Sequence, residues 1–266
     1  MMRRRYRVRA ASLAALVALA GCAAPAGTPE SALNSSTPTM GEESAEHVRA
    51  RVHTELAANY YDLGNLSVAL EEAKEALRSD PNYGPAHNVL GLVYGALKED
   101  RLAEESFQRA LRIDQFDSDA NHNYGQFLCQ HGREEDGIRY FMAAVRNPLY
   151  RTPDRSYVNA GICARRRGDV AGAENYFQNA LKLRPSQPQA LYNMADLAYA
   201  RGDFTAARNY LARLTKTTVP NAEVLWLGVR IERRLGDRNS EASYATQLRR
   251  NFPESKEAQA LASGEN

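Results

Sequence analysis

The sequence predicts an all-α protein whose folded part is a solenoid of paired helices. Two observations carry this prediction: a turn position recurs with an almost constant period, and small and aromatic residues recur at helical spacing on both sides of it. The turn position is held by Gly64, Lys98, Gly132, Gly168, Gly202 and Gly236, which lie 34 residues apart except for one step of 36. A period of this length is typical of stacked helical repeats.

Each repeat places an amphipathic helix on either side of the turn. In the second repeat, Gly91 and Tyr94 share one face of the first helix, and Ala103, Phe107 and Ala110 share one face of the second. The small residues let two helices approach closely, and the aromatic ring fills the space beside them. Glycine at the turn can adopt a positive φ that ends the first helix, and the polar residue that usually follows is suited to capping the second.

This pattern resembles the tetratricopeptide repeat over residues 50–255. The resemblance implies a right-handed superhelical solenoid of six helix-turn-helix repeats within a domain of residues 45–255. The repeats are expected at about 50–83, 84–117, 118–151, 154–187, 188–221 and 222–255. Residues 256–266 are expected to form a C-terminal cap or tail, with a short helix at 256–262. Repeat six has Val229 and Glu232 where Gly and Tyr are usual, and end repeats often deviate in this way.

Residues 1–21 are predicted to be a lipoprotein signal peptide. Five arginines and no acidic residue precede the apolar stretch 10–20. As a helix this stretch would rise about 16 Å, which is too short for a hydrocarbon core of about 30 Å. A basic start followed by a short apolar run is instead typical of a signal peptide.

The tetrapeptide LAGC, residues 19–22, resembles the bacterial lipobox. The resemblance implies cleavage before Cys22, a diacylglycerol thioether on its sulfur and an acyl chain on the new N-terminus. Two or more acyl chains hold a protein stably on a membrane. Ala23 in place of Asp implies transport to the outer membrane, so we expect a lipid-anchored protein on its periplasmic face. The alternative is a secreted protein with an incidental cysteine.

Residues 22–44 are predicted to be the lipidated N-terminus and a flexible linker, because they are rich in Ala, Pro, Gly, Ser and Thr and have almost no bulky apolar residues. The formal net charge of the chain is +2, and subtracting the five arginines of the signal peptide leaves −3. This mildly acidic balance argues against a nucleic-acid partner held by charge.

No constellation of residues typical of an enzyme occurs in the sequence. It has no GxSxG, HExxH, phosphate-binding loop or dinucleotide-binding glycine set. The five histidines show no metal-ligand spacing. We therefore expect no catalytic residues, no metal, no cofactor and no small-molecule substrate.

Two internal cysteines occupy similar heights in neighbouring repeats. Cys129 lies near the end of the first helix of repeat three, and Cys163 lies in the first helix of repeat four. Because neighbouring first helices pack side by side in such a solenoid, a disulfide is possible if the Cα atoms come within about 7 Å. An oxidising compartment would favour the bridge. Two separate buried thiols are the alternative.

The first helices are expected to line a concave surface that binds a protein partner. Asn123, Asn159 and Asn193 occupy one equivalent position in repeats three to five, where amides can hold an extended peptide or merely bond the neighbouring helix. Arginines toward the C-terminal end of this face either receive an acidic partner or form a solvated basic face. The remaining predicted residues of the surface are Tyr61, Leu92, Gln126, Ile162, Asp196 and Tyr199.

Three segments are similar to the PilF/PilW family of type IV pilus lipoproteins: NHNYGQFLCQHGREEDGIRYFMAAV, NPLYRTPDRSYVNAGICARRRGD and VLWLGVRIERRLGD. The resemblance implies a pilotin that binds the outer-membrane secretin and promotes its localisation and multimerisation. A general periplasmic scaffold for cell-wall enzymes or outer-membrane protein assembly is the alternative. The second segment begins with a longer loop at 147–156, which is either drift in a surface loop or a contact loop.

Overall fold

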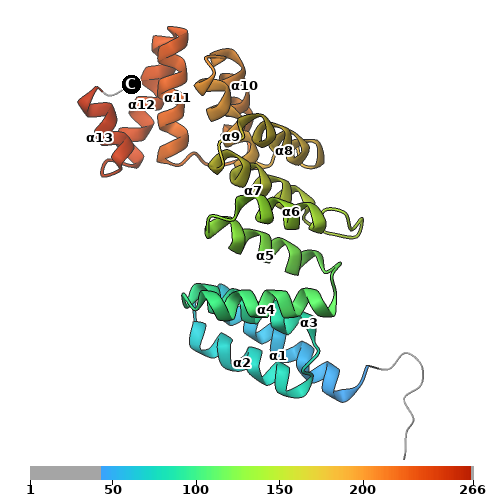
Figure 1. Ribbon diagram of the computed structural model, residues 1–266. Helices are drawn as coiled ribbons and strands as arrows, with labels where there is room; N and C mark the ends of the chain where they lie inside the picture. Colours follow the sequence, from blue (N-terminus) through green and yellow to red (C-terminus); the bar gives the residue numbers. More distant parts are fainter. Residues whose placement is uncertain (1–42, 265–266) are drawn as a thin grey trace, which may run out of the picture. The chain divides into compact units, whose positions relative to one another are not determined.

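The computed structural model describes residues 43–264, and every regular element in that range is an α-helix (Figure 1). The predicted signal peptide, Cys22 and the linker up to residue 42 lie outside the described residues. The thirteen helices of the described range are α1 (Ala45–Asp62), α2 (Leu66–Ser79), α3 (Gly84–Ala96), α4 (Asp100–Ile113), α5 (Ser118–Gln130), α6 (Glu134–Ala144), α7 (Pro153–Arg166), α8 (Val170–Leu183), α9 (Pro188–Ala200), α10 (Phe204–Thr215), α11 (Ala222–Leu235), α12 (Arg238–Asn251) and α13 (Lys256–Ser263).

The helices pack as successive pairs, from α1 with α2 to α11 with α12, and each pair is one repeat. The second helix of each repeat contacts the first helix of the next, which stacks the repeats in chain order (Figure 1). First helices also contact one another, α1 with α3, α3 with α5, α5 with α7 and α9 with α11, so that they share one side of the stack. The predicted all-α solenoid of paired helices is confirmed. In the part of the chain described here, no helix is both long and apolar enough to cross a bilayer.

The two helices of a repeat approach closely because a glycine of the first faces an aromatic ring of the second. A Cβ atom added to Gly91 would lie 2.7 Å from the Phe107 ring, and one added to Gly161 would lie 2.6 Å from the Phe177 ring. Both rings are buried. The predicted fit of small and aromatic residues is therefore confirmed in these repeats.

The turn between the two helices adopts positive φ at every predicted position. The five glycines have φ between 74° and 85°, and Lys98 has φ 65°. An L-residue pays a steric cost there that glycine does not. The residue after the turn was expected to cap the second helix, and its side chain does so in the last three repeats, where Asp169, Asp203 and Asp237 accept backbone N–H bonds. The expectation is wrong for Asn65, Glu99 and Arg133, which occupy the cap position without a side-chain cap bond.

Repeat six corrects the predicted register by one residue. A Cβ atom added to Gly228 would lie 2.8 Å from the Tyr244 ring, so Gly228 is the small residue of this helix pair and Val229 is not its substitute. Gly236 lies eight residues after Gly228, whereas the turn residue lies seven after the small residue in repeats two and four, and Gly236 is the C-cap of α11 in the left-handed conformation. The shift also explains Glu232, which is buried and receives a bidentate hydrogen bond from the Arg208 guanidinium.

Two features depart from a regular stack. Helix α6 ends at Ala144 and α7 begins only at Pro153, so the extra residues of the longer step lie in the connection between repeats three and four. At the C-terminal end, α13 covers repeat six, where Ala258 and Leu261 pack against Val229 and Leu248. This helix gives the last repeat the apolar contact that a following repeat would otherwise provide.

Candidate functional site: the inner groove

The first helices carry two adjoining hollows on their shared side, which we call together the inner groove. The N-terminal hollow, about 190 Å³, is lined by Tyr61, Leu92, Asn123 and Gln126, among others. The second hollow, about 170 Å³, is lined by Gln126 together with Asn159 and Ile162. The structure thus brings six of the predicted partner-binding residues to one continuous surface, while Asn193, Asp196 and Tyr199 lie outside the groove on α9.

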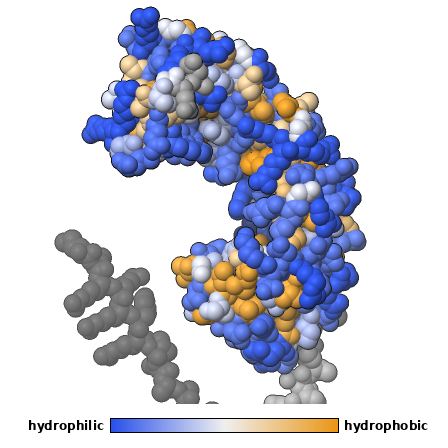
Figure 2. Space-filling view, turned by 60° about the vertical axis from the view of Figure 1, so that its left-hand side comes forward, coloured by the Kyte–Doolittle hydropathy of each residue, from blue (hydrophilic) through white to orange (hydrophobic). Residues whose placement is uncertain are grey.

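The N-terminal hollow has an apolar wall and a polar rim that includes Lys98 and Gln130. Leu92 is half-buried, and the rings of Phe107 and Phe127 form the wall behind it. Gly91 and Gly95 add no side chain, so the helix backbone itself is part of the lining. In Figure 2, hydrophobic residues gather on the N-terminal repeats. A hollow of this kind accepts an apolar side chain of another polypeptide.

Polar groups stand where the two hollows meet. Gln126 and Gln130 line both hollows and are exposed. Each amide offers a donor and an acceptor to the backbone of a bound segment. At the N-terminal end of the groove, burial raises the pKa of the Tyr61 hydroxyl, with a smaller contribution from Asp62. Tyr61 is therefore a neutral donor and acceptor at neutral pH.

The three equivalent asparagines already bond to neighbouring side chains. Asn123 Nδ2 donates to Asn88 Oδ1 at 3.1 Å, and Asn159 Nδ2 lies 3.4 Å from His122 Nε2. Asn193 Oδ1 accepts from Arg165 at 3.1 Å. These contacts join adjacent first helices, so they favour the packing interpretation over a ladder of free amides for a peptide.

Behind Asn159 lies a buried polar cluster that was not predicted from the sequence. His122 Nδ1 is 2.7 Å from Ser156 Oγ, which donates to the Tyr150 hydroxyl at 3.3 Å. Burial, with a smaller contribution from the nearby Arg155 charge, lowers the pKa of His122 to about 4. The imidazole is therefore neutral at neutral pH and serves as a fixed hydrogen-bonding group between repeats three and four.

The arginines of the C-terminal first helices also have partners within the chain. Arg165 pairs with Asp196 at 2.6 Å, and Arg166 donates to the Cys129 carbonyl at 3.3 Å. The Arg230 guanidinium lies 4.3 Å from the centre of the Tyr199 ring, and Arg234 lies 4.8 Å from that of Phe204. These contacts favour a structural role for this basic face.

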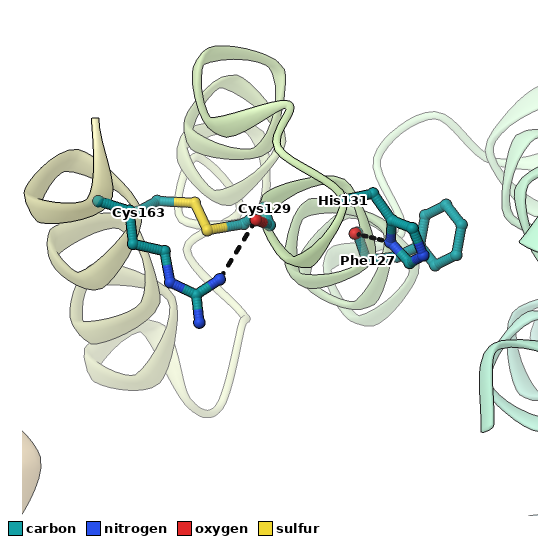
Figure 3. The surroundings of a disulfide bond; sticks show 5 residues. Phe127, Cys129, His131 and Cys163 are labelled. Atoms are coloured by element: carbon teal, nitrogen blue, oxygen red, sulfur yellow. Dashed lines mark hydrogen bonds between the residues drawn. A yellow bond between two sulfur atoms is a disulfide. The ribbon is translucent and has the colours of Figure 1, made fainter. Parts of the chain in front are cut away.

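Cys129 and Cys163 form a disulfide in the structure, with their Cα atoms 5.9 Å apart (Figure 3). It joins α5 to α7 below the second hollow, which Cys129 helps to line. At the C-terminal end of α5, the ring centres of Phe127 and His131 lie 4.1 Å apart, and both residues line the N-terminal hollow (Figure 3). The disulfide therefore ties together the two repeats that form the C-terminal half of the inner groove. Within residues 43–264, no group of three His, Cys, Asp or Glu side chains is placed to hold a metal ion.

Comparison with known proteins agrees with this architecture. Tetratricopeptide-repeat family models match residues 54–118 and 164–226. The type IV pilus assembly protein PilF of Pseudomonas aeruginosa is 31% identical over 207 residues, which are 78% of this chain and 82% of that protein.

Two solved structures share both fold and sequence. A structure of Pseudomonas aeruginosa PilF superposes with a TM-score of 0.77 at 30% identity, covering 84% of this chain and 100% of that one. The structure of PilW, described as a widely conserved type IV pilus biogenesis factor, gives a TM-score of 0.72 at 32% identity and covers 80% of this chain and 98% of the other. The chain therefore belongs to the PilF/PilW family of tetratricopeptide-repeat proteins, which act in type IV pilus biogenesis through protein–protein interaction.

Proposed function

We propose that this protein is a pilotin: it binds the outer-membrane secretin of the type IV pilus through the inner groove and promotes secretin localisation and multimerisation. Membership of the PilF/PilW family supports the pilus role. The observation that carries the binding site is the convergence of Tyr61, Leu92, Gln126 and Ile162, from four successive repeats, on one groove.

The groove suits a secretin segment with an apolar side chain. That side chain enters the N-terminal hollow against Leu92 and Phe127 and removes apolar surface from water, at about 25 cal/mol per Å². The amides of Gln126 and Gln130 then bond the backbone of the segment as it passes the junction of the two hollows.

Placing a charge in the groove should abolish this activity. We expect Leu92→Arg to remove the heat-stable secretin multimers and the surface pili, because a charged side chain would replace the apolar surface on which the secretin segment packs. Gln126→Arg, at an exposed position, should have the same effect without disturbing the core. Gel analysis of envelopes from a complemented deletion strain measures the multimers.

Leu183→Arg is the matched control, because Leu183 is exposed at the end of α8 and outside the groove. Photo-cross-linking from positions 61, 92 and 159 identifies the bound chain. Normal multimers and pili in both groove variants would rule out the proposed site. Capture of a cell-wall hydrolase or an outer-membrane assembly component, with no secretin, would favour the general scaffold instead.

We further propose that Cys22 carries the lipid that anchors the protein to the outer membrane. Cys22→Ala should leave the repeats folded, with an unchanged helical circular dichroism spectrum, but remove the protein from the outer-membrane fraction, since no acyl chain would hold it there. Incorporation of radiolabelled palmitate measures lipidation, and membrane fractionation measures the location of the protein. A variant that still fractionates with the outer membrane would contradict the anchor.

A further inference from the structure

A separate and larger pocket lies on the second helices of repeats two and three, away from the inner groove. It has a volume of about 720 Å³ and is formed by α4, α6 and the connections that follow them. We call it the outer groove, and its principal lining residues are Leu111, Phe116, Arg139, Tyr140, Arg146 and Pro148. Its volume is in the range of sites that bury a ligand or a projecting side chain.

The lining of the outer groove is more apolar than polar, and large apolar side chains at its rim are exposed to water. Phe116 is 73% exposed at the rim, and Leu149, one residue beyond the lining, is 85% exposed. Tyr140 packs at 4.6 Å on the Tyr124 ring, which is itself buried, so this wall is firmly supported. Exposed aromatic and aliphatic side chains beside a supported hollow are typical of a surface that a partner covers.

The charges of the outer groove all have one sign. Arg139 and Arg146 line it, and no carboxylate does. Arg139 is held at 2.7 Å by Asp136, which lies outside the lining. Between residues 43 and 264, the Arg146 guanidinium has no ion-pair partner. An apolar hollow with an uncompensated guanidinium at its edge is complementary to an anion that carries an apolar group.

A smaller site of mixed charge adjoins the groove on the far side of Phe116. Arg151 and Arg155 lie there beside three aspartates. Two of these carboxylates are already used locally, since Asp114 accepts the Phe116 N–H and Asp117 caps α5. The positive charge of the outer groove is therefore confined to its own two arginines, and the aspartates make this rim unsuited to a broad anionic surface.

We propose that the outer groove binds an acidic polypeptide segment of a second partner, with an aromatic or aliphatic side chain seated between Phe116 and Tyr140 and a carboxylate on Arg146. The outer groove is a concave pocket, which suits a single side chain that projects from a peptide. A bilayer, in contrast, would be a flat anionic surface and would meet Asp114, Asp117 and Asp119 at the rim. The longer connection between α6 and α7 is therefore a contact loop, since it carries Arg146 and Pro148.

Fluorescence anisotropy with two labelled peptides and the full chain tests this proposal. One peptide has a central Phe-Leu pair followed by a single Asp among neutral residues, and in the other peptide this Asp is Asn. The Asp peptide should bind, and Arg146→Glu should weaken its binding about tenfold, because an attraction becomes a repulsion. Phe116→Ser should weaken it by a similar factor, and the Asn peptide should bind poorly to the unchanged protein.

Two variants act as controls. Arg250→Glu reverses an exposed charge on the second helix of repeat six, and Leu92→Arg alters the inner groove; neither should change binding of the Asp peptide. No binding of the Asp peptide, or equal binding by Arg146→Glu, would overturn the proposal. So would loss of binding in Leu92→Arg, which would place the peptide in the inner groove.

Two further measurements distinguish other occupants. Arg146-dependent binding to phosphatidylglycerol vesicles without peptide binding would make the outer groove a lipid-facing surface and refute the peptide proposal. Sedimentation that shows an Arg146-dependent dimer without peptide binding would assign it to a second copy and refute it equally. The proposal is supported if the Asp peptide binds, if both Arg146→Glu and Phe116→Ser weaken its binding, and if neither vesicle binding nor a dimer depends on Arg146.

Discussion

Phe177→Ala should lower the free energy of unfolding by about 3–5 kcal/mol. The Phe177 ring is fully buried and fills the space beside Gly161, whose backbone approaches it because no Cβ is present. The ring also packs against Val158 of the first helix and Met194 of the next repeat. Removing it leaves a cavity bordered by three helices, and the close packing of α7 on α8 limits how far they can collapse into it.

Urea denaturation followed by circular dichroism measures this loss. Because a solenoid is stabilised by contacts within and between neighbouring repeats, the variant should also broaden the transition by uncoupling repeats four and five. Phe116→Ala is the matched control: the same ring is lost from an exposed position, so stability should change by no more than about 0.5 kcal/mol. Equal midpoints for the two variants would contradict the role assigned to Phe177.

The sequence predicts the contact between Gly161 and Phe177 because the same pattern of residues recurs in several repeats. A single glycine near an apolar residue predicts little. A glycine in the first helix and a phenylalanine in the second, repeated at the same distances from the turn, identify the two helices of a repeat and their buried faces. The turn at Lys98 is predicted in the same way, from its place in the series and in spite of its residue type. Repeat six shows the limit of the method. There, Gly236 keeps the period while Gly228 does not, because α11 gains one residue between them.

The inner groove is predicted only in outline. Periodicity places Tyr61, Leu92, Gln126 and Ile162 on one side of the stack, since it fixes which helix face each residue occupies. It does not fix hydrogen-bond partners, which depend on side-chain rotamers and on the rotation between repeats. The sequence therefore leaves open whether Asn159 holds a peptide or bonds the neighbouring helix, and in the structure it lies against His122. The pairing of His122 with Ser156 is missed for the same reason, because the repeat period aligns their helices but does not say which polar side chains meet.

Removing the disulfide with the double variant Cys129→Ala, Cys163→Ala should lower the free energy of unfolding by about 2–4 kcal/mol. The bridge closes a loop of 34 residues, and a link of this length restricts the unfolded chain substantially. It also lies where the stack is least regular, since the connection from Ala144 to Pro153 is the longest one between adjacent repeats within residues 43–264. Alanine is the suitable replacement, because both sulfurs are buried and a serine hydroxyl would need a partner.

Reductant supplies the matched comparison in urea denaturation. The unaltered chain with reductant should approach the stability of the double variant, whereas the double variant should not respond to reductant at all.

Trypsin should cut the reduced chain faster at Arg146 and Arg151, which lie in the connection that the bridge spans. Because the bridge holds α5 to α7 under the second hollow, reduction should also weaken secretin binding more than it weakens peptide binding at the outer groove. Alkylation that finds both thiols free in protein isolated without reductant would show that the cysteines act as separate buried side chains.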